Sequence, residues 1–162
     1  MRLAVSLFVG AILILVTGCE AVTVEDGPGG NTLCFNYFQS CINPILDENI
    51  AGKTCSASGC HRQGEAFGGA FRTDPTAADG STEMLANFIS AKGATNLNNA
   101  ANSKLLTKPL VSGILHGGGV VFTTADPQYS EILYWINNSV TAQDDPICDN
   151  LFNGTACQIY NP

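Results

Sequence analysis

The chain has 162 residues, and its 14 aspartate and glutamate residues against 7 lysine and arginine residues give a formal net charge of −7. This length fits one domain with a short extension. The acidic balance excludes the basic surface that neutralises phosphates, so we expect no nucleic-acid binding.

The chain begins with an apolar segment that has the features of an export signal. Arg2 is followed by a nearly uninterrupted apolar run at 3–16, which has the length of a signal-peptide core and is short for a membrane span. The sequence Val-Thr-Gly-Cys that ends at Cys19 resembles the bacterial lipobox, whose cysteine is lipidated and becomes the mature N-terminus. The resemblance implies a leader at 1–18 and a lipid anchor on Cys19. The alternative is an uncleaved anchor helix.

The segment after the anchor is expected to form a flexible acidic tether at 19–33. It contains Gly-Pro-Gly-Gly at 27–30 and no periodic apolar residues, which is typical of linkers. Glu20 stands where the lipoproteins retained in the inner membrane have aspartate, so we expect the outer membrane, on its periplasmic face. The remainder, 34–162, is then one domain in an oxidising compartment.

The first helix of this domain is expected at 35–49. Phe38, Cys41, Ile42 and Ile45 recur at helical spacing. Pro44 should kink or restart the helix, because proline has no N–H to donate.

Two cysteines and a histidine form the next motif. Cys55 and Cys60 enclose four small residues and are followed at once by His61, which gives the pattern C-x-x-x-x-C-H. This resembles the attachment motif of c-type cytochromes, commonly C-x-x-C-H, in which two thioethers hold the haem and the histidine binds its iron. The resemblance implies one haem c, held by Cys55 and Cys60, with His61 as the proximal iron ligand. The longer loop must bulge outward, and Gly59 can supply the positive φ that this requires.

Two other interpretations of this motif stay open. In the first, Cys55 and Cys60 form a disulfide beside an ordinary surface histidine. In the second, the motif contributes to a zinc site, which needs four ligands and could be completed only by His116 and distant cysteines.

A second helix is expected to begin at a Ser81 or Thr82 cap and to end at Gly93. Its apolar residues fall at helical spacing; they are Met84, Leu85, Phe88 and Ile89. A methionine in such a stripe is usually a core residue. Met84 is nevertheless a second candidate for the sixth position on the iron.

The segment around the second histidine extends the resemblance. It reads S-x-L-L-x-K-P at 103–109, H-G-G-G at 116–119, and Phe122. This is similar to small single-haem cytochrome c domains of environmental bacteria, including planctomycete-type proteins, and the likeness covers most of residues 35 to 138. It implies His116 as the distal iron ligand, with three glycines that let the backbone approach the flat ring. The alternatives are Met84, an open or water-filled position, and a His116 ring that only binds a backbone carbonyl.

A third helix is expected from Asp126 as N-cap and Pro127 as first residue. Its stripe is formed by Tyr129, Ile132, Leu133 and Ile136, flanked by Tyr134 and Trp135. No convincing strand pattern is present. The expected fold is therefore all-α: cytochrome c-like helices around a covalently bound haem, with long Gly- and Asn-rich loops and disulfide staples.

The cytochrome c class also implies a disulfide pattern, since the helix before the attachment motif crosses the final helix there. Cys34 and Cys41 would be about 10 Å apart along a continuous helix, beyond the reach of a bridge. Cys148 and Cys157 follow the last helix. We favour cross-links from the first pair to the second, while local pairs remain possible if Cys34 precedes the helix.

With two axial ligands, the expected activity is one-electron transfer without catalysis. A peroxidase or gas-sensing haem protein is a further alternative, which requires that His116 does not bind the iron. The side chains expected to line the pocket are Leu105, Leu106, Phe122 and Trp135. Those near the motif that could pair with haem propionates are Lys53, Arg62 and Arg72.

The expected partners are basic redox proteins of the periplasm or outer membrane, which an acidic surface would steer toward the chain. The competing hypothesis is a haem-free, disulfide-stapled lipoprotein with a binding or structural role.

Overall fold

The computed structural model describes residues 31–65, 69–145, 148 and 157–160. The predicted leader at 1–18, the lipidation site Cys19 and most of the predicted tether lie outside these residues. The end of the expected tether belongs to the fold, because Thr32 and Leu33 are both buried. Thr32 pairs with Val140 in an antiparallel bridge, with N–H···O distances of 2.6 and 2.8 Å.

The first helical stretch is built from three consecutive pieces, α1 (Phe35–Tyr37), the π-helical turn η1 (Phe38–Ile42) and α2 (Asn43–Asp47). The π turn lies directly before Pro44, which has no N–H to give to the carbonyl of Ser40. The N–H of Asn43 instead reaches back five residues to the carbonyl of Phe38. The helix expected at 35–49 thus forms, with a wider π turn directly before the proline. It ends at Asp47, two residues earlier than expected.

Helix α3 (Thr82–Lys92) has both of its predicted limits, and helix α5 (Pro127–Asn137) has its predicted start. Helix α3 is capped by Ser81, whose Oγ accepts a 3.0 Å bond from the N–H of Met84. Helix α5 starts after Asp126. The Asp126 carboxylate accepts from the N–H and hydroxyl of Thr123 rather than from the helix, so it orders the preceding turn.

Two short helices were not predicted. They are the 3₁₀ turn η2 (Ala100–Asn102) and α4 (Lys104–Thr107). Each is a single turn, which is too short to display a helical period in the sequence.

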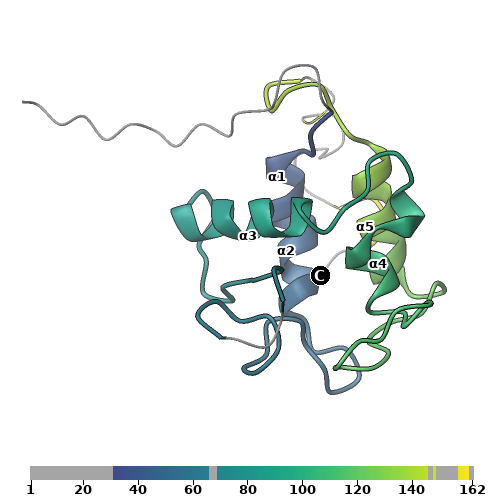
Figure 1. Cartoon of the computed structure of the whole chain (residues 1–162). Coiled ribbons are helices and arrows are strands. Elements are labelled where there is room, and N and C mark those ends of the chain that lie inside the picture. The colour runs from purple at the N-terminus through teal and green to yellow at the C-terminus, as the bar shows by residue number, and fades with distance from the viewer. Residues whose placement is uncertain (1–30, 66–68, 146–147, 149–156, 161–162) are drawn as a thin grey trace, which may run out of the picture.

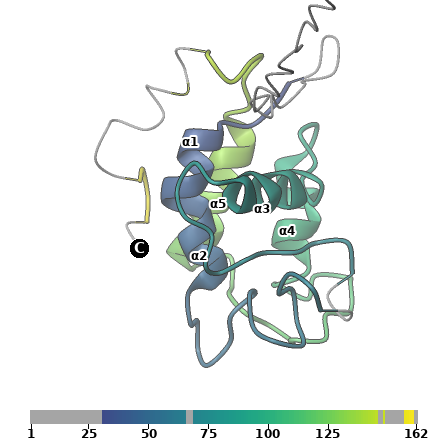
Figure 2. The same ribbon diagram turned by 90° about the vertical axis from the view of Figure 1, so that its left-hand side faces the viewer.

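The core lies where α1, η1 and α2 meet α3 and α5, with α3 crossing the first helical stretch and α5 beside it (Figures 1 and 2). Phe38, Phe88 and Trp135, one from each element, are fully buried with ring centroids 5.5 to 6.3 Å apart. The indole N–H of Trp135 donates to the carbonyl of Cys34 at 3.2 Å. Trp135 therefore fixes the first helix against the last.

Two disulfides join the first helical stretch to the chain after α5. Cys34 pairs with Cys148 and Cys41 pairs with Cys157, with Cα–Cα distances of 5.4 and 5.5 Å. Cys34 does precede the helix, as its extended N-cap residue. Even so, the bonds are the long-range cross-links that we favoured and not the local pairs.

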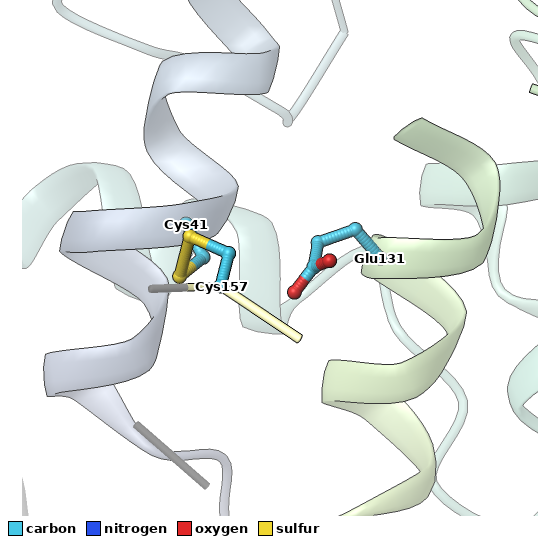
Figure 3. Close-up of side chains that lie close together, drawn as sticks. All are labelled: Cys41, Glu131 and Cys157. Carbon is cyan, nitrogen blue, oxygen red and sulfur yellow. A yellow bond between two sulfur atoms is a disulfide. The ribbon is translucent and has the colours of Figure 1, made fainter. Parts of the chain in front are cut away.

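A buried carboxylate holds the last described segment beside one of these disulfides. Glu131 of α5 lies next to the Cys41–Cys157 bond (Figure 3). It accepts hydrogen bonds from the hydroxyl of Tyr37 and from the N–H groups of Gln158, Ile159 and Tyr160, the last three at 3.3, 2.7 and 2.6 Å. Burial, and then the hydrogen bond to Glu131, raise the pKa of Tyr37 far above its usual value. We call these contacts the Glu131 tail site.

Candidate functional site

A cavity of about 440 Å³ brings the predicted functional residues together. Its size is within the range of about 300–1,000 Å³ that small-molecule and cofactor sites occupy. Much of its wall is apolar, with Leu46, Phe71, Ile89, Leu105, Phe122 and Ile132 among the lining side chains. Cys55, His61 and His116 line the same cavity.

His61 is held from its backbone and from its ring. Its N–H donates to the carbonyl of Cys55 at 3.1 Å, and its carbonyl accepts from the N–H of Thr73 at 2.7 Å. The ring packs on Phe71 with centroids 4.8 Å apart, and Nδ1 lies 3.1 Å from the Phe71 carbonyl oxygen. A carbonyl can only accept, so Nδ1 carries a proton and donates in this bond. Metal-binding histidines commonly donate their other ring N–H to a backbone carbonyl in this way.

His116 has the same arrangement on a separate loop. Its Nδ1 lies 3.0 Å from the carbonyl oxygen of Gly119, whose own N–H donates back to the His116 carbonyl at 2.9 Å. A Cβ on Gly118 would stand 3.2 Å from Cε1 of the ring, and Gly119 has a φ of +65°. Two of the three glycines therefore shape the turn that holds the His116 ring.

The two imidazoles face the cavity as a nearly parallel pair. Their ring centroids are 6.1 Å apart and their planes differ by 16°. Metal–imidazole bonds of about 2 Å on opposite sides of one ion would place the ring centres roughly 6 Å apart. The centroid spacing therefore fits a bis-imidazole iron site, and the apolar walls fit a porphyrin.

The loop between the two motif cysteines is formed by bonds to an acidic residue that sequence analysis missed. Glu65 accepts from the Ser58 hydroxyl at 2.8 Å and from the N–H of Gly59, whose φ of +78° makes the expected bulge. These two hydrogen bonds, in that order, lower the pKa of Glu65. A single glutamate in a polar loop gives no sequence signal for this role.

The two motif cysteines are free thiols, whereas the four structural cysteines are paired. The alternative of a Cys55–Cys60 disulfide therefore disagrees with the structure. Cys55 lines the cavity, and Cys60 is not among its lining residues. Burial, followed by the charge of Asp47, raises the pKa of Cys55 from 9.0 to about 11.

Several expected neighbours of the cofactor lie elsewhere. Met84 is 2% exposed in the core and does not line the cavity, so it is not placed to bind iron there. Leu105 and Phe122 line the cavity as expected, but Leu106 and Trp135 are core residues outside it.

The three basic residues expected to meet the propionates are directed to backbone carbonyls. Lys53 donates to Val120 at 2.6 Å, Arg62 to Ser56 at 3.3 Å, and Arg72 to Phe71 at 2.9 Å. None of these three basic residues lines the cavity. Lys53 instead ties the chain before Cys55 to the chain after His116.

The zinc alternative has no support in the described part of the chain. There, the one group of three His, Cys, Asp or Glu ligand atoms close together is Cys41, Glu131 and Cys157 (Figure 3). Its two sulfurs are bonded to each other, so neither is the thiolate that zinc binds.

The raised pKa of Cys55 makes a testable prediction for protein produced without haem. Because the thiolate is the nucleophile, a pKa of about 11 in place of 9.0 lowers the reactive fraction at pH 8 by about a hundredfold. Alkylation of Cys55 by iodoacetamide should therefore be slow at pH 8 and should rise until about pH 11. The same chain unfolded in urea is the control, and equal Cys55 rates in both states would contradict the burial of this thiol.

Comparison with known proteins gives no assignment. No family model matches the chain, and no match was found among curated proteins or solved structures. In the residues that the structure describes, none of the helices has both the length and the apolar character of a membrane span. A function has to be inferred from the residues and their geometry.

Proposed function

We propose that this chain is a lipid-anchored c-type cytochrome of the bacterial cell envelope that carries single electrons through one haem. The observation that carries the proposal is the His61–His116 pair, held 6.1 Å apart across an apolar cavity that Cys55 also lines. The proposal includes the fold class, which is all-α and cytochrome c-like.

His61 and His116 are the residues that would hold the iron. The carbonyls of Phe71 and Gly119 accept from Nδ1 of the two rings, so each ring would bind the iron through Nε2. Cys55 and Cys60 would form the thioethers. When bound, the haem supplies a ferric/ferrous couple, at a lower potential than histidine and methionine ligation would give.

The other residues of the site position these ligands and keep water away. Lys53 connects the two ligand-bearing loops through its bond to the Val120 carbonyl. The ring of Phe71 supports His61, while Leu105, Phe122 and Ile132 contribute apolar wall. Apolar, rigid surroundings limit solvent access to a redox centre, and this sets its potential. No residue is assigned a catalytic role.

The cellular part of the proposal rests on the sequence. The apolar run and the lipobox-like residues ending at Cys19 indicate export and lipidation, and Glu20 favours the outer membrane, facing the periplasm. Several acyl chains hold a protein to a bilayer far more firmly than one. The net charge of −7 would steer encounters with basic redox partners.

The test is expression of the full chain together with a cytochrome maturation system. We expect a pyridine hemochrome spectrum and a haem stain that survives denaturing electrophoresis, because thioethers are covalent. The double variant Cys55→Ser, Cys60→Ser is the matched control and should lose the stain. A colourless wild-type protein, from cells that load a reference cytochrome, would overturn the proposal and favour the haem-free lipoprotein.

A further inference from the structure

Two lysines from one short helix line the cavity. Lys104 is the first residue of α4 and Lys108 is its C-cap, and both belong to the cavity wall. Residues four apart lie on the same side of a helical turn. The cavity therefore has a cationic side.

Neither ammonium group has a partner among the residues that the structure describes, which sets this pair apart from the other bases of the domain. Lys53, Arg62 and Arg72 donate to carbonyls, and Lys92 donates to the hydroxyl of Thr32. The chain has twice as many acids as bases, 14 against 7. Like charges four residues apart also repel each other. Two unpaired cations at one cavity wall thus point to an anionic group on what the cavity binds.

We infer that Lys104 and Lys108 bind the two propionate carboxylates of the haem. The inference rests on the proposed function. It places the propionate edge of the haem beside Lys104 and Lys108 and the vinyl edge beside Cys55. A haem has its vinyl groups and its propionates on different edges of the ring. Here the thioether residue Cys55 and the two lysines come from separate parts of the fold, the 55–60 loop and α4.

The physical reason is the cost of burying charge. A carboxylate taken out of water needs a partner, and two carboxylates need two. Lysine ammonium groups on flexible stems can reach both oxygens of such groups. Lys104 is exposed and Lys108 half-buried, so the carboxylates would lie at the cavity mouth. These lysines take the role that sequence analysis gave to Lys53, Arg62 and Arg72.

The experiment compares haem-loaded wild type with the double variant Lys104→Gln, Lys108→Gln. Loss of two cations beside the haem stabilises the ferric state, so the midpoint potential should fall, and more at low ionic strength than at high. The propionate bending band in the resonance Raman spectrum, which reports bonding to the carboxylates, should shift. Lys92→Gln is the control for each single glutamine variant, because it removes one positive charge from a residue that does not line the cavity, and it should leave both readouts unchanged.

A second variant separates contact from general charge and from misfolding. Lys104→Arg with Lys108→Arg keeps both cations and should retain the wild-type potential. If the double glutamine variant does not accumulate, each single variant should show part of both changes. Unchanged potential and Raman band in haem-loaded glutamine variants would overturn this inference alone. A wild-type protein without haem would overturn the proposed function, and this inference with it.

Discussion

Replacing His116 with alanine should convert the ferric protein from a low-spin to a high-spin absorption spectrum. In the proposed site, the imidazoles of His61 and His116, whose centroids are 6.1 Å apart, would supply two strong-field nitrogen ligands to the iron. The variant retains only one of them. We expect complete conversion at neutral pH, with covalent haem retained because Cys55, Cys60 and His61 are unchanged. Added imidazole should restore the low-spin spectrum.

The position of His116 makes this variant a clean test. Its ring is half-buried in a local turn closed by bonds between residues 116 and 119, and the preceding Leu115 is 91% exposed. Truncation there removes little of the core. Met84→Leu is the control, since Met84 is buried outside the cavity, and its spectrum should stay wild type. A His116→Ala protein that remains low-spin would show that another residue binds the iron.

Replacing Glu131 with glutamine should destabilise the folded protein by about 3 kcal/mol, which is the scale of hydrogen bonds to a buried charged group. The carboxylate accepts three backbone N–H groups and the Tyr37 hydroxyl while 0% exposed. A glutamine amide offers one acceptor oxygen and turns a donor toward the remaining N–H groups. The free energy of unfolding is to be measured by urea titration monitored by circular dichroism.

Glu48 provides the matched control for Glu131. It accepts from the Tyr160 hydroxyl at 2.7 Å and from Gln128, but it is only partly buried. Water can replace what Glu48→Gln loses, so that variant should cost less than about 1 kcal/mol. Equal losses in the two variants would mean that the Glu131 tail site contributes nothing special to stability.

The helices with clear local signals could be predicted from the sequence. Ser81 and Asp126 directly precede α3 and α5, and a helical apolar stripe follows each of them, although only the Ser81 side chain caps its helix. Pro44 predicted an interruption of the first helix, but the sequence did not show that this interruption would take the form of a π turn. The one-turn helices α4 and η2 have no period to detect.

The sequence predicted several residues that line the candidate site, but not all of its walls. Cys55, His61 and His116, which the sequence motifs singled out, line one cavity; their role as haem ligands stays a proposal. Neighbours on a helix point about 100° apart, so Leu105 can line the cavity while Leu106 enters the core, and sequence alone does not decide which. The role of Glu131 depends on residues 158–160, which follow Cys157 and donate their N–H groups to its carboxylate. Such a contact between distant segments leaves no local pattern in the sequence.

Peptide mapping by tandem mass spectrometry, on protein purified from the envelope of cells with a cytochrome maturation system, tests the central claim most directly. The peptide that contains Cys55, Cys60 and His61 should carry the added mass of one haem, joined through both sulfurs. Recovery of that peptide without the added mass, with its two cysteines as free thiols or bonded to each other, would contradict the account.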